Sequence, residues 1–369
     1  MPPKKKNHFV PQFYFRNFVT GDAISLFNIA RKLHIPAASI ARQCQRGYLY
    51  GKETGIEEAL SELEGRVSEV VRDLIRTEKL PEKLSPQYIA LVTYINLQMS
   101  RAPRHGAEMT QTMTAMFRAA MRDNPSLPTK LRAGLDSIEV THENPVLFQM
   151  GISGKYAVLL HDLKPVLIRN DSGIPFVTSD SPVVAFNQWA QDVKHRGVLG
   201  TLCAGLQLFL PLSPKLMLLL YDDGVYTSSS KIRLLRDSSA QALNALQLSE
   251  NVDNLYFDGT PSTLDSIQKL PFHWLPEAKK SHKLVEAESV DDPSSKLLHM
   301  FQAIVGQLNI PEIRIRNAAK SATHAQRGNS YRPLAKYAFD MMERGRELPP
   351  PPRKAGLFRA VREDEIEIE

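Results

Sequence analysis

Five polar residues spread over the first half of the chain have side chains suited to phosphodiester chemistry. An imidazole can act as a general acid or base, carboxylates can orient it or bind a metal ion, and arginines bind phosphate through paired hydrogen bonds. If the fold brings the five together, they would form a cleavage site. We therefore predict catalytic roles for His8, Glu64 and Asp180. We predict that phosphate is bound by Arg101 and Arg104. Because carboxylates can bind metal ions, a divalent metal ion is a candidate cofactor.

Each of these residues could instead have a purely structural role. His8 could bond to the backbone within a cluster of aromatic side chains, and Glu64 could be solvated or form an ion pair with Arg101. Asp180 stands two residues before a proline, where it could accept a hydrogen bond from its own downstream backbone as an Asx turn. Arg101 and Arg104 could form ion pairs that support the fold.

Positive charge is concentrated towards the C-terminus. The chain has 46 Lys and Arg against 40 Asp and Glu, and residues 311–354 alone hold ten basic residues against four acidic ones. Basic residues on an extended segment bind phosphate backbones with salt-sensitive affinity, although a solvated segment without a partner would look the same. We predict that nucleic acid is contacted by Arg314, Arg316, Lys320 and Arg327.

The elements that must position these residues change in type along the chain. Apolar residues at three- and four-residue steps predict helices over residues 56–80, 86–99 and 145–163, and a further one over 238–250. Short strands are predicted at residues 23–29, 183–186, 206–210, 216–221 and 254–257. Residues 166–168 and 176–178 flank a turn sequence and are predicted to form a β-hairpin. Helices first and mostly strands later indicate an α+β fold with a helical N-terminal half and a β-rich second half.

Two segments lie outside this plan. Residues 108–121 place four methionines and Phe117 on one helical face, which we interpret as core packing, with a partner or ligand groove as the alternative. The C-terminal region is predicted to be a helical and irregular basic tail, with a short amphipathic helix from Arg332 and a polyproline segment at residues 349–352.

Composition excludes several classes of protein. The chain has 369 residues, of which 43% are hydrophobic, so it can bury a substantial core. The longest apolar run is far shorter than the ~20 residues of a membrane span, so no membrane partner is expected. Only Cys44 and Cys203 are present, which excludes a disulfide framework and favours a cytoplasmic location. Glycine-rich nucleotide-binding motifs and the H-E-x-x-H zinc motif are absent from the sequence.

The block His8-Phe-Val-Pro-Gln-Phe-Tyr-Phe-Arg-Asn-Phe18 resembles the opening signature of the bacterial family known as domain of unknown function 4238. Further similarities follow in the family's order: Glu64-Gly65, Arg101-Ala-Pro-Arg104 and Thr178-Ser-Asp-Ser-Pro182. Phe15 replaces the usual leucine and Ser181 a common asparagine. The resemblance spans roughly residues 7–260. It implies association with mobile elements and anti-phage defence, but no mechanism.

From these observations we expect four parts: an N-terminal signature block (residues 1–53), a helical region (54–163), a β-rich region of the same core (164–275) and a C-terminal extension (276–369). We expect an anti-phage effector that is a toxic nuclease acting on RNA in preference to DNA. The alternative is a non-enzymatic sensor or toxin that binds a phage or host protein through the methionine-rich face or the tail.

Overall fold

The computed structural model describes residues 6–19, 23–51, 54–122, 124–193, 197–250, 252–288, 296–320 and Arg327. Its first half is mainly helical and its second half is rich in sheet, which confirms the predicted α+β class. In this part of the chain, no helix combines the length and the apolar character that a bilayer crossing requires. The amphipathic helix expected from Arg332 and the polyproline segment lie outside the described residues.

The helices follow the predicted pattern closely. Ser85 caps one of them by accepting a hydrogen bond from the Tyr88 N–H, with Pro86 at the first helical position. The α-helices are α1 (Gln12–Phe15), α2 (Thr54–Thr77), α3 (Pro86–Gln98), α4 (Pro103–Arg122), α5 (Thr129–Ala133), α6 (Pro145–Tyr156), α7 (Asp237–Ala245), α8 (Pro261–Gln268), α9 (Leu275–Ala278) and α10 (Asn317–Lys320). Short 3₁₀ turns extend several of them, including η4 (Ala157–Leu160) and η6 (Leu246–Leu248).

In the part of the chain that the structure describes, the strands form two larger sheets and three two-stranded ladders. They are β1 (Lys6–His8), β2 (Ala23–Asn28), β3 (Leu33–Ser39), β4 (Gln45–Gly47), β5 (Lys164–Asn170), β6 (Thr178–Ser179), β7 (Val184–Phe186), β8 (Gln207–Ser213), β9 (Leu216–Tyr221), β10 (Tyr226–Thr227), β11 (Lys231–Leu234), β12 (Asn254–Phe257), β13 (His282–Glu288), β14 (Lys296–Gln302) and β15 (Arg314–Ile315). The larger sheets have the orders β11-β5-β9-β8-β7 and β3-β2-β12-β6.

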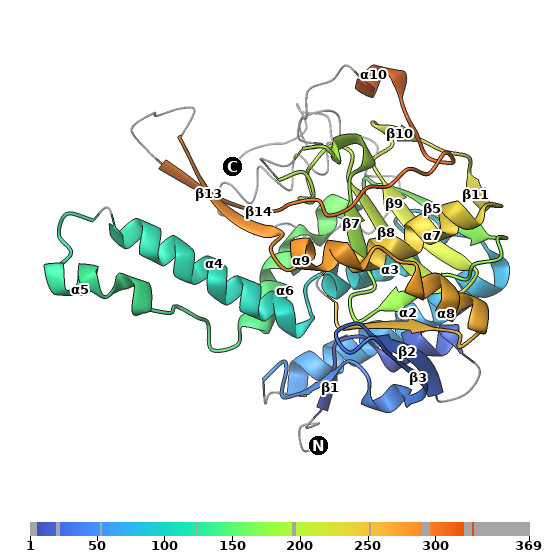
Figure 1. Ribbon diagram of the computed structural model, residues 1–369, viewed down its shortest axis with the longest axis horizontal. Coiled ribbons are helices and arrows are strands. Elements are labelled where there is room, and N and C mark those ends of the chain that lie inside the picture. Colours follow the sequence, from blue (N-terminus) through green and yellow to red (C-terminus); the bar gives the residue numbers. More distant parts are fainter. Residues whose placement is uncertain are drawn as a thin grey trace.

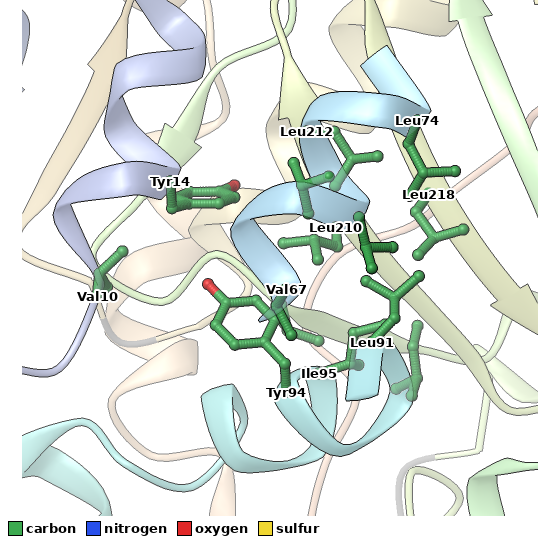
Figure 2. Packing of buried hydrophobic residues seen from close by; sticks show 14 of the residues in the cluster. Val10, Tyr14, Val67, Leu74, Leu91, Tyr94, Ile95, Leu210, Leu212 and Leu218 are labelled. Carbon is green, nitrogen blue, oxygen red and sulfur yellow. The ribbon is translucent and has the colours of Figure 1, made fainter. Parts of the chain in front are cut away.

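The five-stranded sheet is buried on both faces. Successive residues of a strand point to opposite faces, and in β9 the side chains of Leu216, Leu218 and Leu220 enter one core while Met217 and Leu219 enter another. This explains why the β9 sequence is continuously apolar instead of alternating. Helices α2 and α3 cover the first face, where Figure 2 shows their side chains against β8 and β9.

The N-terminal block is part of the same core. Strand β2 pairs with β12, more than 200 positions later, in the four-stranded sheet. Tyr14 of α1 is fully buried, and its hydroxyl lies 2.8 Å from the Thr178 hydroxyl of β6. The aromatic block therefore joins the start of the chain to the β-rich region.

The predicted hairpin around residues 170–173 is wrong. Strand β5 pairs with β9 and β11, whereas β6 pairs with β12 in the other sheet. Asn170 explains the local turn, because its side-chain oxygen accepts from the Ser172 N–H and its amide donates to the Ile174 carbonyl. The Val177 N–H then bonds to the Asn244 side chain instead of to a neighbouring strand. The turn signal was genuine, but it redirects the chain between two sheets.

Helices α4 and α5 extend from the body as an arm, and α6 packs at the base of this arm (Figure 1). Gly106 permits the close contact between α4 and α6, since a Cβ atom there would lie 2.6 Å from a Val146 methyl group. Of the α4 residues, only Gly106 and Thr114 are buried, and 47% of Met116 is exposed. The interpretation of the methionine-rich face as core packing is therefore wrong: this face is half-buried on the arm.

The chain beyond residue 275 returns to the body. Ile304, Leu308, Ile310 and Ile313 are buried in the core on the second face of the five-stranded sheet. Strand β15 pairs with β10, and the β13–β14 hairpin contacts α4. This region of the C-terminal extension thus completes the core.

Candidate active site

Arg101 lies in the interior and connects two parts of the predicted site. It is 1% exposed, and its Nη2 atom donates to Glu64 Oε1 and to the backbone carbonyl oxygen of His8, each at 2.7 Å. The Tyr50 hydroxyl donates to the same carbonyl at 3.3 Å. Arg101 and Glu64 therefore form the ion pair that was one of the two interpretations offered for them. A guanidinium in this position is not presented to a phosphate at the surface.

The His8 imidazole points to a different neighbourhood. Its Nε2 atom lies 3.1 Å from the Ala41 carbonyl oxygen and 3.5 Å from the Gln12 amide nitrogen. Strand β1 places it there by pairing with β4. The imidazole thus bonds to the backbone within the aromatic block, while the His8 carbonyl group makes the contact with Arg101.

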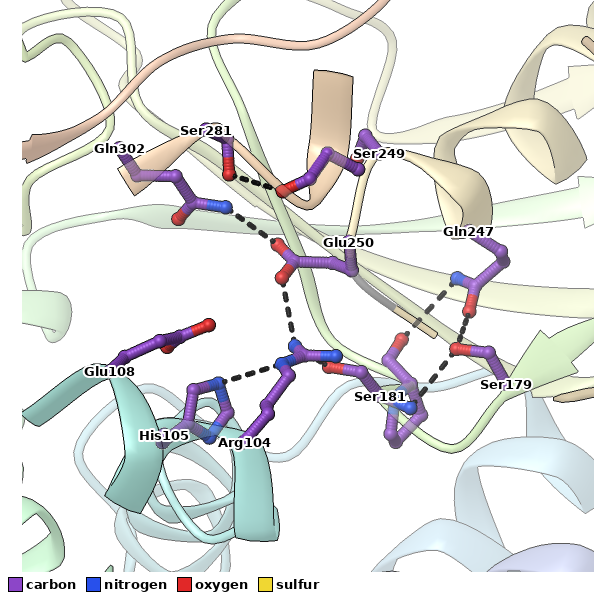
Figure 3. Close-up of polar contacts among 12 residues, drawn as sticks. Arg104, His105, Glu108, Ser179, Ser181, Gln247, Ser249, Glu250, Ser281 and Gln302 are labelled. Atoms are coloured by element: carbon purple, nitrogen blue, oxygen red, sulfur yellow. Dashed lines mark hydrogen bonds and ion pairs between the residues drawn. The ribbon is translucent and has the colours of Figure 1, made fainter. Parts of the chain in front are cut away.

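Arg104 lies in the first turn of α4 and joins the arm to the β-rich region. Its Nη2 atom donates to Glu250 Oε2 at 2.8 Å and to the Ser181 hydroxyl, as Figure 3 shows. Gln302 of β14 donates to the other Glu250 oxygen at 3.4 Å. Residues from α4, the β6 loop, the η6 loop and β14 thus meet in one polar cluster.

Asp180 adjoins this cluster. One of its carboxylate oxygens accepts from the N–H groups of Asp253 and Asn254, at 3.0 and 3.2 Å. The carboxylate therefore bonds across the sheet to the start of β12 and not to its own downstream backbone. Burial raises the pKa of Asp180 to about 7, and the charge of Arg104 opposes this rise.

The structure separates the five predicted residues into two clusters. One contains Glu64, Arg101 and the His8 backbone, and the other contains Arg104 with Asp180 beside it. The two adjoin because residues 101 and 104 stand on either side of the α4 N-terminus. The assigned chemical roles stay predictions.

Sequence reasoning missed a pair of titratable side chains at the same place. Glu108 lies one turn after Arg104 on α4, and its Oε1 atom is 3.6 Å from Nδ1 of His282 on β13. Their side chains are 20% and 33% exposed. Burial raises the pKa of Glu108 to about 7 and lowers the pKa of His282. The four-residue spacing from Arg104 could have suggested Glu108, whereas no local signal places His282 opposite it.

The basic residues that were predicted to contact nucleic acid lie in different environments. Arg314 and Arg316 are exposed, and the Arg316 Nε atom donates to the carbonyl oxygens of Asp223 and Tyr226. The side chain of Lys320 lies outside the described part. Arg327 corrects the prediction of a nucleic-acid contact: it is 1% exposed, pairs with Asp162 and donates to the Leu159 carbonyl oxygen. An interior guanidinium with these partners is not available to a phosphate backbone.

We also compared the positions of the carboxylate, imidazole and thiol side chains with the requirements of a metal site. Among the described residues, no group of three or more His, Cys, Asp or Glu side chains could hold a metal ion together.

The fold and the site thus define an α+β protein with a polar cluster where the arm meets the body. Residues 6–259 match the sequence model of the family described as protein of unknown function (DUF4238), and the chain belongs to this family. Neither the curated proteins nor the solved structures provide a significant match. The family region ends before β13, so it contains Glu108 but not His282.

Proposed function

We propose that this protein is an RNA-cleaving effector of anti-phage defence, with its chemistry at Glu108 and His282 beside Arg104. The observation that supports this best is the facing carboxyl and imidazole, 3.6 Å apart and partly open to solvent where the arm meets the body. A site for proton transfer needs groups that are fixed by the fold and still reachable by a substrate. The Arg101 guanidinium, of which only 1% is exposed, meets only the first condition.

The proposed reaction uses the 2′-hydroxyl group of the RNA as nucleophile. His282 accepts the 2′-hydroxyl proton while the 2′-oxygen forms a bond to the adjacent phosphorus atom. The bond from phosphorus to the 5′-oxygen breaks, and the protonated carboxyl of Glu108 supplies a proton to that oxygen. The products are a 2′,3′-cyclic phosphate and a 5′-hydroxyl end, so neither water nor a redox partner is consumed.

The environment suits these assignments. Because the pKa of Glu108 is raised to about 7, its carboxyl can keep a proton near neutral pH and act as the acid. Because the pKa of His282 is lowered, its imidazole stays neutral and can act as the base. Arg104 brings a positive charge next to both groups, where charge develops on the phosphate oxygens.

The proposed substrate and the proposed biological context are supported by different observations. The choice of RNA follows from the acid–base pair, because only RNA carries the internal 2′-hydroxyl nucleophile. The context of anti-phage defence follows from the family resemblance alone.

The direct test is cleavage of a labelled single-stranded RNA, with analysis of the new ends. We expect the wild-type protein to release cyclic phosphate ends, and His282→Ala and Glu108→Gln to lose at least 100-fold in rate. His273→Ala is the matched control, since His273 is exposed on the body. Cleavage that persists in both site variants, or the absence of cleavage under conditions where the protein is toxic, would contradict the proposal.

The second candidate is the non-enzymatic sensor or toxin, and the arm favours it. The methionine-rich face of α4 is half-buried, and Met116 exposes 47% of its surface. Flexible methionine side chains suit a binding surface that must adapt to a partner. Met116→Glu would abolish defence under this second function, whereas it would leave RNA cleavage by the purified protein unchanged under the first.

A further inference from the structure

An open depression of about 810 Å³ lies beside the β10–β15 ladder. Residues 309–311 and 313–318 form most of its lining, and Gln188 and Thr227 complete it. Depressions of ~300–1,000 Å³ are the usual size for small-molecule ligands. Elements β10 and α10 mark this region in Figure 1, at the far side of the body from the arm.

The polar side chains that line the depression include positively charged guanidinium groups and neutral amides. Arg314 and Arg316 supply two guanidinium groups, and amide side chains come from Gln188, Asn309 and Asn317. None of the residues that line the depression is acidic. A ligand held there would therefore meet positive charge from two arginines.

Arg316 is held in position by the backbone around it. Its own N–H donates to the Val225 carbonyl oxygen at 2.8 Å, and its Nε atom donates to the carbonyl oxygens of Asp223 and Tyr226 at 2.7 and 3.1 Å. These contacts use one edge of the guanidinium. The two terminal nitrogens have no hydrogen-bond partner among the described residues. A guanidinium fixed in this way loses little side-chain entropy when it binds an anion.

Two acidic residues close to the lining segments, Glu312 and Asp222, have hydrogen-bond partners of their own. Glu312 interrupts the lining segment, but its carboxylate lies 3.5 Å from the Ser239 hydroxyl. The Asp222 carboxylate accepts from the N–H groups of Gly205 and Gly224 at 2.9 and 3.0 Å. The fold therefore directs these two carboxylates to partners other than Arg314 and Arg316.

We infer that this depression binds a phosphate ester of nucleotide size, with the phosphate between Arg314 and Arg316. Guanidinium groups bind phosphate oxygens through charge-assisted, often paired hydrogen bonds. The amides of Asn309 and Gln188 can bond to polar groups of the rest of the ligand, and Ile315 offers an apolar contact. The inference goes beyond the proposed RNA cleavage, because none of these residues belongs to the Glu108–His282 site.

The test is calorimetric titration of the full-length protein with AMP, adenosine and inorganic phosphate at low salt. We expect AMP to bind, inorganic phosphate to bind more weakly and adenosine to bind at least tenfold more weakly than AMP, because adenosine lacks the charged group that the arginines bind. A single-stranded RNA hexamer with a 5′-phosphate separates the two sources of the phosphate group. Binding of the hexamer without binding of AMP would overturn the assignment of a small-molecule ligand.

Variants connect the binding to the depression. Arg314→Gln should weaken AMP binding about tenfold. Arg76→Gln on α2 is the control, since Arg76 is also exposed and its loss changes the net charge equally. Arg316→Gln should weaken binding further, but it also removes backbone contacts, so Arg314→Gln decides the question. Equal AMP affinity of the Arg314 and Arg76 variants, or equal affinity for AMP and adenosine, would overturn the inference.

Discussion

Arg101 donates a hydrogen bond of 2.7 Å to the backbone carbonyl oxygen of His8, and not to its imidazole. The same nitrogen pairs with Glu64, so one buried guanidinium connects β1, α2 and the start of α4. Two residues that had been predicted to share a phosphodiester-cleaving site thus meet through the main chain. Their relationship fixes the path of the N-terminal block against the helical region.

Replacement of Arg101 should therefore destabilise the fold. Arg101→Ala would leave the Glu64 carboxylate and the His8 carbonyl oxygen without this donor, and a buried polar group left without its partner costs about 1–3 kcal/mol. Urea denaturation would measure this loss. Arg66→Ala, which removes an exposed pair with Glu62, should change the free energy of unfolding by less than about 1 kcal/mol. An Arg101→Ala variant as stable as wild type would show that the pair is not structural.

Asp180 should also affect stability. In Asp180→Ala, the N–H groups of Asp253 and Asn254 lose their acceptor, which should cost about 1–3 kcal/mol. Asp180→Asn keeps an acceptor oxygen, so it should retain most of that stability in the same denaturation experiment. A purely catalytic Asp180 would instead give two variants with unchanged unfolding transitions.

Glu108 should make the stability depend on pH. Its pKa is raised in the folded state to about 7 from an ordinary value of 4.5, so the folded protein holds this proton more tightly than the unfolded chain. The stabilisation is complete below pH 4.5 and is lost as the pH rises through about 7. At about 1.4 kcal/mol per pKa unit, the loss amounts to about 3 kcal/mol.

The measurement compares wild type with Glu108→Gln, which does not titrate. Between pH 5 and pH 8, the wild-type free energy of unfolding should fall relative to that of the variant. Parallel stability curves over this range would mean that Glu108 titrates normally in the folded protein.

The proposed reaction has a characteristic pH profile. Cleavage needs neutral His282 and protonated Glu108, so the rate should fall below the lowered pKa of His282 and again above about pH 7. The alkaline decrease should be absent from the residual activity of Glu108→Gln. A rate that rises steadily from pH 6 to pH 9 would assign the acid to another group.

The sequence predicted local features better than long-range ones. The helical periodicity of residues 56–80 and the Ser85 cap depend on neighbouring residues, and both occur as α2 and α3. The partner of β6 is β12, about 75 positions later, so a turn signal at Asn170 could not reveal it. The contact between Glu108 and His282 spans even more of the chain, which is why the candidate pair emerged only from the fold.

Deletion of residues 311–369 provides the last test, because part of this region lies in the core. In the structure, the deletion removes Ile313 from the core, strand β15, and the buried pair of Arg327 with Asp162. Loss of a buried aliphatic side chain costs about 2–5 kcal/mol, and an unpaired buried carboxylate adds to that cost. We expect the truncated protein to be insoluble or to unfold at a much lower urea concentration. Arg327→Ala in the full-length chain isolates the ion pair and should be destabilised to a smaller extent. A truncated protein with wild-type stability would show that residues 311–369 only cover a core that is complete without them.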